Sequence, residues 1–152
     1  MFIAEALIVR KELKTRLADL KTRLNAVLVI QEGDTPVEDP LALLASLDQT
    51  LDEYRRLIIS IHLSNLRASL PDGRSLTQAI VERDLLDEQM AILRTVAGEA
   101  LKPNDRYAYS ELRRVPTVDV AALRKEVDTL ARKRRELDTA LQRANWQHEL
   151  VT

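Results

Sequence analysis

Apolar residues recur along the chain in four long stretches, at steps that alternate between three and four positions. A period close to 3.5 residues is typical of amphipathic helices that pack as coiled coils. The spacing therefore predicts helices over about residues 2–31, 40–68, 76–101 and 120–146. The predicted packing positions are Ile3, Ala6 or Leu7, Leu13, Leu17, Leu20, Leu24 and Val27 or Leu28, then Leu44, Leu47, Leu51, Tyr54, Ile58, Ile61, Asn65 and Ala68, then Leu76, Ala79 or Ile80, Leu86, Met90, Leu93, Ala97 and Leu101, and finally Leu123, Val127, Leu130, Leu137, Leu141 and Ala144.

Turn and capping residues lie between these stretches. Gly33 and two prolines stop the first helix, and Asp39 with Pro40 matches the N-cap and the first position of the second helix. Residues 70–75 read Leu-Pro-Asp-Gly-Arg-Ser, in which proline presets the first corner of a turn and glycine accepts a positive φ. Asp119 is placed to cap the last helix.

Two segments leave room for short β structure. Residues 107–117 lose the helical rhythm, so an extended arm or a short strand is expected there, and residues 67–76 could pair as a small hairpin. The predicted class is otherwise mainly α: an antiparallel bundle of four long helices with coiled-coil-like packing. Leu57, Ile59 and Leu63 widen the apolar surface of the second helix, which predicts that it contacts more than one neighbour.

The composition agrees with a helical chain. Hydrophobic residues make up 45% and charged residues 31% of the 152, whereas aromatic residues are only 3%, so the core must be aliphatic. This length predicts one helical domain, residues 1–152. The net charge is −1, without the basic surplus of proteins that neutralise phosphates, so no nucleic-acid partner is expected.

The chain contains no cysteine, which excludes disulfides, thiolate metal ligands and cysteine nucleophiles. No apolar run approaches the roughly 20 residues that span a bilayer. The apolar N-terminal residues lack a basic region before them and a cleavage site after them, unlike an export signal. We therefore expect a cytoplasmic protein without a membrane span.

The packing positions of each predicted helix form an apolar stripe, called its seam here. One polar residue interrupts each seam: Arg10, Asn65, Arg83 and Arg134. Such residues fix helix register and oligomeric state at some cost in stability. A buried arginine needs a carboxylate, which Asp84, Asp87, Glu88 or Asp138 could provide. The alternative is that the polar groups converge on one pocket and bind an anionic ligand.

The remaining chemistry is sparse. His62 and His148 belong to no metal-binding pattern, and no phosphate-binding loop or catalytic motif is present, so no metal or cofactor is expected and an enzyme is not favoured. The basic run at residues 132–135 is flanked by carboxylates and reads as a solvated helix face rather than a nucleic-acid surface. Trp146 either covers the end of a core or anchors an interface.

Several short segments resemble a family of uncharacterised bacterial helical proteins, the septicolysin-like family. They are AEALI at 4–8, QEGD at 31–34, EDP at 38–40, DGRSLT at 72–77, RD at 83–84, SE at 110–111, TVDV at 117–120, LD at 137–138 and NW at 145–146. The resemblance extends over nearly the whole chain and implies a self-associating helical protein of unassigned function.

Three functions follow from these patterns. The first is a structural or interaction protein that forms a homo-oligomer through its apolar seams. The second is a small-molecule binder or enzyme with a polar pocket. The family label suggests the third, a membrane-lytic toxin, although the chain lacks the cysteine and the tryptophan-rich segment of thiol-activated pore formers. The candidate residues for a polar pocket or interface are Asn65, Arg67, Arg74, Arg83, Asp84, Arg134 and Trp146, with the loop at 31–34.

Overall fold

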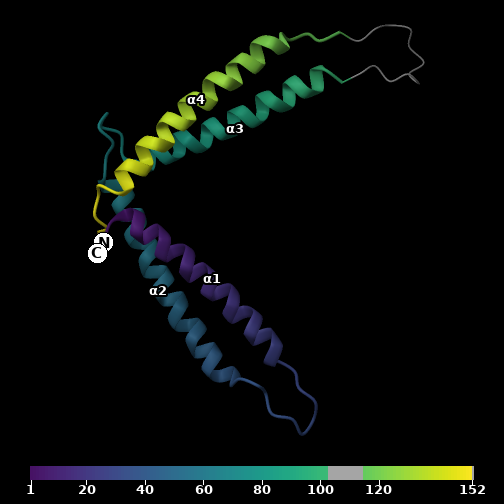
Figure 1. Cartoon of the computed structure of the whole chain (residues 1–152), viewed down its shortest axis with the longest axis vertical. Coiled ribbons are helices and arrows are strands. Elements are labelled where there is room, and N and C mark those ends of the chain that lie inside the picture. Colours follow the sequence, from purple (N-terminus) through teal and green to yellow (C-terminus); the bar gives the residue numbers. More distant parts are fainter. Residues whose placement is uncertain (103–114, 152) are drawn as a thin grey trace, which may run out of the picture. The chain divides into compact units, whose positions relative to one another are not determined.

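The computed structural model describes residues 1–102 and 115–151. These residues form four helices, which are labelled in Figure 1. The helices are α1 (Ile3–Val27), α2 (Pro40–Arg67), α3 (Leu76–Ala100) and α4 (Val120–Asn145). The helices pack in pairs, so the mainly-α prediction is confirmed.

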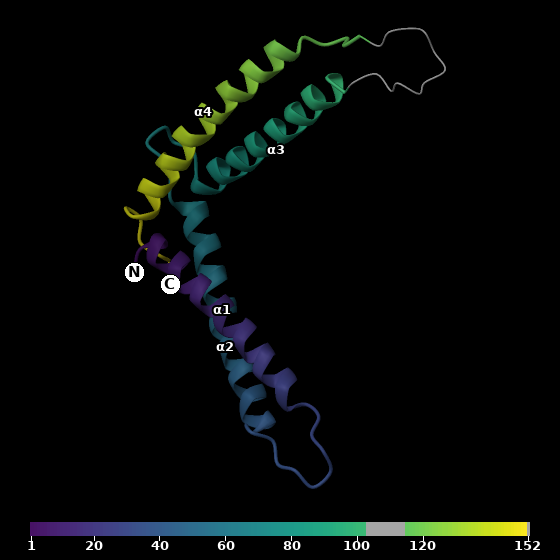
Figure 2. The same cartoon turned by 45° about the vertical axis from the view of Figure 1, so that its right-hand side comes forward.

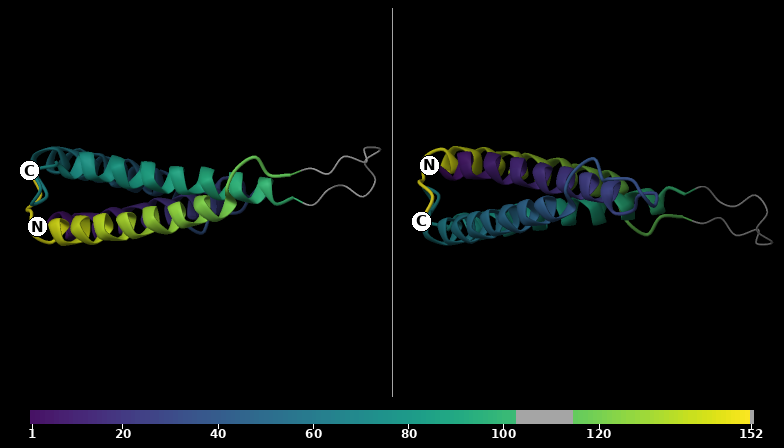
Figure 3. Two further views of the ribbon diagram at one scale, coloured as in Figure 1. Left: turned by 90° about the horizontal axis from the view of Figure 1, so that it is seen from above. Right: turned by 90° about the horizontal axis from the view of Figure 1, so that it is seen from below.

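The chain divides into two compact units. The N-terminal unit consists of Met1–Ser75 together with Gln142–Thr152, and the central unit is Leu76–Leu141. In the N-terminal unit, α1 and α2 run side by side in opposite directions (Figure 2). In the central unit, α3 lies antiparallel to α4, as the two views of Figure 3 show.

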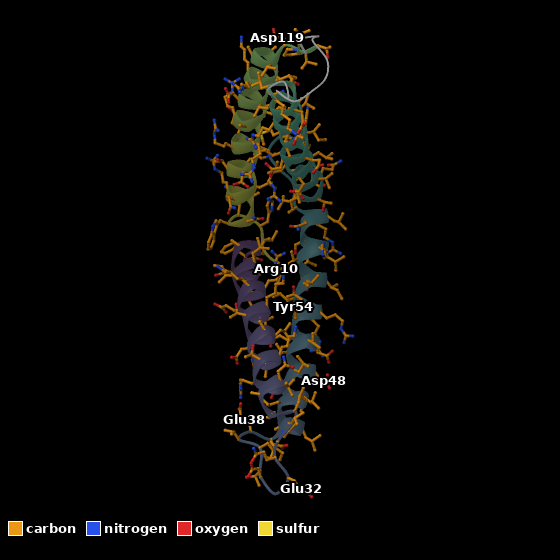
Figure 4. The ribbon with its side chains drawn as sticks, turned by 90° about the vertical axis from the view of Figure 1, so that its right-hand side faces the viewer. Arg10, Glu32, Glu38, Asp48, Tyr54 and Asp119 are labelled. Carbon is orange, nitrogen blue, oxygen red and sulfur yellow. The ribbon has the colours of Figure 1, made fainter. Side chains whose placement is uncertain are left out.

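The seam of α1 is the one that the sequence predicts. Leu20, Leu24 and Val27 are buried, and they form one cluster with Leu43 of α2. Tyr54 lies farther along α2 on the side that faces α1 (Figure 4). Aliphatic side chains repeated along two antiparallel helices account for this pairing.

The predicted seam of α2 is wrong at two positions. Leu44 and Leu51 are exposed, while Leu43 and Thr50 are buried in their place. The seam is hard to recognise because Thr50 and Ser64 carry hydroxyl groups, yet each is only 1% exposed. The Thr50 hydroxyl donates to the Ser46 carbonyl at 2.7 Å, and the Ser64 hydroxyl donates in the same way one turn back. These bonds offset much of the cost of burying the hydroxyl groups.

Helix α1 also ends four residues before its predicted limit. Val29 is 88% exposed, and Leu28 and Ile30 are exposed beside it, so nothing packs on them to extend the helix. The chain turns at Gly33, whose φ of 94° favours glycine. Arg10, predicted on the α1 seam, is exposed instead.

The predicted caps are present, and the turn at residues 70–75 carries one isolated β-bridge without a strand. Asp39 accepts a bond from the Leu41 amide at 3.0 Å and opens α2, and Asp119 does the same for Ala122 at the start of α4 (Figure 4). Ser69 and Ser75 form an isolated antiparallel bridge around Gly73, which has a φ of 88°. Most of the predicted β segment at 107–117 lies outside the described residues, and its described end, 115–117, contains no strand.

Backbone bonds close the N-terminal unit at the two chain ends. The Ile3 amide donates to the His148 carbonyl at 3.0 Å, and the Leu150 amide donates to the Met1 carbonyl at 2.8 Å. The Val151 amide donates to the buried Ser64 hydroxyl at 2.8 Å. The segment after α4 is therefore an integral part of this unit.

The central unit has an apolar cluster of its own. Met90 of α3 packs with Val127 and Leu130 of α4, and partly buried side chains surround them. The predicted seam positions of α4 are buried except Leu123, which is partly buried, whereas Leu101, predicted on the α3 seam, is exposed. The prediction of one domain over residues 1–152 stays a prediction.

Candidate functional site

An apolar stripe lies on α2, away from the side that packs on α1. Its six members are between 42% and 74% exposed. At 3.6 residues per turn they fall within about a third of the helix circumference, whereas the buried residues lie on the opposite half. We call this surface the α2 outer face; its apolar members are Leu41, Leu44, Leu51, Ile59, Leu63 and Leu66.

Charged residues are interleaved with this stripe. Asp48 lies on the outer side of α2 in Figure 4, and Asp52, Arg55 and His62 lie on the same side by helical spacing. Arg55 Nη2 is 2.7 Å from the Asp52 carboxylate. The sequence suggested an apolar surface wider than one stripe, through Ile59 among others, but none of the charged residues was among the predicted site residues.

Seven residues of the α2 outer face form a near-palindrome centred on Arg55, whereas Leu41, Asp52 and Leu63 stand outside it. Moving outward from Arg55 in both directions, the helix presents an apolar residue, a titratable residue and another apolar residue. Towards the N-terminus these are Leu51, Asp48 and Leu44, and towards the C-terminus they are Ile59, His62 and Leu66. The spacings are four, three and four residues on both sides, so the two halves match in geometry as well as in type.

Four of the predicted site residues lie in the N-terminal unit. Asn65 is partly buried, and its Oδ1 atom has no hydrogen-bond partner in the described part of the chain. Arg67 is exposed at the end of α2. Arg74 binds the Asp72 carboxylate, with Nη2 at 2.6 Å, and this bond holds the pKa of Asp72 below its usual value. Trp146 is 53% exposed just beyond the end of α4, and both readings of its role stay predictions.

The other three predicted residues lie in the central unit and belong to one ion-pair network. Arg134 Nε is 3.2 Å from the Asp87 carboxylate, which joins α4 to α3. The Asp138 carboxylate lies between Arg134 and Arg83, at 3.9 Å and 3.7 Å. Arg83 also contacts Asp84 at 2.8 Å. Arg83 and Arg134 therefore have carboxylate partners, while a ligand pocket formed by these residues stays a prediction.

The loop at residues 31–34, which the sequence attached to the polar pocket, follows α1 at the opposite end of the helix from the chain termini (Figure 1). Nearby, Arg23 Nε donates to Glu38 Oε2 at 3.1 Å, and this bond lowers the pKa of Glu38. Within the N-terminal unit, the loop therefore lies far from Arg67 and Arg74 at the other end of α2.

Among the described residues, no helix is long and apolar enough to cross a membrane. In the same part of the chain, no three histidine or acidic side chains are grouped so that they could hold a metal ion.

Comparison with known proteins identifies relatives without a known activity. The model of a family of unknown function, DUF6847, matches residues 10–150. The crystal structure of a functionally unknown conserved protein from Corynebacterium diphtheriae is 34% identical in sequence, with a TM-score of 0.90 and 99% of each chain covered. No curated protein matches the chain.

These findings overturn the resemblance inferred from short sequence segments. The septicolysin-like assignment is wrong, because the matching family and the similar structure carry no such description. Some of the segments quoted for it, such as EDP at 38–40 and DGRSLT at 72–77, lie at a helix cap and at a turn. The toxin function that depended on that label has no remaining support.

Proposed function

Because the chain belongs to DUF6847, a family of unknown function, we propose from its own surface that it is an interaction protein that self-associates into a homo-oligomer through α2. The observation that carries the proposal is the α2 outer face. Large exposed apolar patches commonly mark protein–protein interfaces. Here six aliphatic side chains lie along a single helix.

The palindromic order of the face favours a second copy of α2 as its occupant. In a two-fold symmetric interface, residue i contacts residue j of the other subunit and j contacts i. Pairing two α2 helices antiparallel about Arg55 would place Leu44 against the partner's Leu66, and Leu51 against the partner's Ile59. Apolar positions would then meet apolar positions along about 33 Å of helix, at 1.5 Å per residue.

The polar residues are also complementary in this arrangement. Asp48 would face the partner's His62 twice, once on each side of the axis. The two Arg55 side chains would approach each other at the axis, and each already has the Asp52 carboxylate at 2.7 Å to balance it. A parallel arrangement would instead place Asp48 against the partner's Asp48, which is unfavourable.

Light scattering after size-exclusion chromatography tests the proposal at micromolar concentration. We expect about twice the monomer mass of 17.3 kDa. Leu51→Lys and Ile59→Lys should each return the protein to a monomer, because they bring charges into the centre of the interface. Ile8→Lys is the matched control, since Ile8 is 51% exposed on α1 outside this face. A wild-type monomer, or a dimer unaffected by both substitutions, would refute the proposal.

Introduced cysteines test the orientation, because the chain has no cysteine of its own. Arg55→Cys lies on the axis and should form a disulfide with its own copy. Leu44→Cys should not cross-link alone, but should do so when mixed with Leu66→Cys. Cross-linking of Leu44→Cys to itself would show a parallel pair.

The remaining parts of this proposal are a cytoplasmic location and the absence of a nucleic-acid partner. Cell fractionation tests the first. Electrophoresis with labelled duplex and single-stranded DNA at low salt tests the second, because non-specific binding is strongest there.

A further inference from the structure

The central unit contains a groove that none of the preceding assignments uses. It has a volume of about 390 Å³ and lies where the last turns of α3 meet the first turns of α4. Its lining is Arg94, Ala97, Gly98, Arg124, Val127 and Asp128. We propose that this groove binds a small organic anion, a phosphate monoester or carboxylate that carries an apolar group.

The two arginines of the groove differ from the other arginines that join α3 to α4. Arg83 and Arg134 each have carboxylate partners in the ion-pair network. Arg94 and Arg124, one from each helix, have no ion pair in the part of the chain that the structure describes. Two like charges that share a groove repel each other, and a bound anion would relieve that repulsion.

Gly98 supplies the second observation. It lies within α3 and does not adopt the positive φ that favours glycine. A Cβ atom added there would meet no atom within 4 Å, so no close packing excludes a side chain. Gly98 lies in the last turn of the helix, two residues before its end at Ala100. Because Gly98 has no side chain, the space beside it in the groove stays open.

The lining also indicates the kind of anion. Guanidinium groups bind carboxylates and phosphates through paired N–H donors. Ala97 and the buried Val127 give the groove an apolar floor. Its volume falls within the range of small-molecule sites, which are mostly apolar with a few polar groups that orient the ligand. Asp128 leaves the lining with a net charge of +1, which matches a ligand of low charge.

Isothermal titration calorimetry of the full chain with phenyl phosphate, benzoate and inorganic phosphate tests the proposal. We expect an aromatic anion to bind more tightly than inorganic phosphate, and phenol not to bind. Preference for phenyl phosphate or for benzoate distinguishes a phosphate monoester from a carboxylate. If neither aromatic anion gives a binding heat, the proposal is overturned.

Substitutions locate the site. Arg94→Gln and Arg124→Gln should each weaken binding about tenfold or more, because each removes charge-assisted hydrogen bonds. Gly98→Leu should abolish binding by filling the groove. Arg135→Gln is the control, since Arg135 is exposed on α4 outside the lining. Equal weakening by Arg135→Gln, or no weakening by the groove variants, would overturn the assignment; circular dichroism confirms that each variant is folded.

The groove and the α2 outer face lie on different units, so their tests are independent. Leu51→Lys should leave anion binding unchanged even if it abolishes self-association. Arg94→Gln should leave the oligomeric mass unchanged.

Discussion

The α1–α2 pair and the α3–α4 pair are built from helices of similar length, between 25 and 28 residues, but different side chains join them. Leucine and valine fill the seam between α1 and α2 near the loop, and backbone bonds to the C-terminal segment close the other end of the unit. Between α3 and α4, the apolar cluster around Met90 is followed by ion pairs between Asp87, Asp138 and two arginines.

The difference between the two helix pairs shows two ways in which the register of one helix against another can be fixed. An aliphatic seam gains stability from burial but tolerates sliding, so the N-terminal unit adds specific backbone bonds at its end. The central unit has arginines at seam positions, and their pairing with Asp87 and Asp138 favours the register that brings these groups together. Perturbing the two units should therefore produce effects of different size and different salt dependence.

The largest effect is expected from the aliphatic seam. Leu20→Ala should lower the free energy of unfolding by about 3 kcal/mol, since it removes a buried side chain and leaves a cavity. Urea denaturation followed by circular dichroism measures the change. Leu51→Ala on the α2 outer face is the control. Measured in a variant that is monomeric, it should lower the free energy of unfolding far less than Leu20→Ala does. Similar losses from both would contradict the seam described for α2.

A smaller effect is expected at the chain end. Ser64→Ala removes the acceptor of the Val151 amide and should cost about 1–2 kcal/mol. Hydrogen exchange should quicken at Val151 but not within α3. Ser46→Ala is the matched control, because its hydroxyl bonds only to the preceding turn of its own helix. Unchanged exchange at Val151 would argue against the closure of the unit by this segment.

The ion pairs of the central unit should contribute less still. Arg134→Met should cost up to about 1 kcal/mol, because the pairs are partly exposed. The loss should shrink as salt is raised, unlike that of Leu20→Ala. Arg132→Met measures the effect of removing an arginine from α4 outside the ion pairs. A double-mutant cycle of Arg134→Met with Asp87→Asn isolates the contribution of the Arg134–Asp87 pair. A loss that does not depend on salt would assign the role of Arg134 to packing of its alkyl chain.

The smallest effect concerns the loop of the N-terminal unit. The bond from Arg23 lowers the pKa of Glu38, so its stabilisation is present above the unfolded pKa and is lost as pH falls through the folded pKa. Glu38→Gln should slightly lower the unfolding temperature at neutral pH and have no effect once Glu38 is protonated. Glu32→Gln, a loop residue of the same type, should have no effect at either pH.

The sequence predicts structure well where leucines alone define a seam. The packing positions of α1 and α4 follow from Leu20, Leu24, Leu130 and Leu137, because apolar residues at other positions of these helices are few. On α2, aliphatic residues occupy more than one side. The buried side of α2 can be identified only if Thr50 is recognised as a buried residue. Its hydroxyl bonds to a carbonyl of its own helix, which the sequence does not reveal.

The candidate sites were harder to predict for a physical reason. A seam arginine predicts that some carboxylate pairs with it, but Asp87 and Asp138 are selected by the rotation of each helix, which one sequence does not specify. The groove was missed because Gly98 has no motif around it. Its significance depends on two arginines that are 30 positions apart in the sequence and come together only when the helices pair.

The bonds between the chain ends have a consequence for the order of folding. The residues of the central unit are contiguous, so α3 and α4 can pair without any contribution from the two chain ends. The N-terminal unit is synthesised first, yet His148 and Val151 must be made before Ile3 and Ser64 acquire their final partners. During synthesis, the first helices to emerge are therefore the last to be completed.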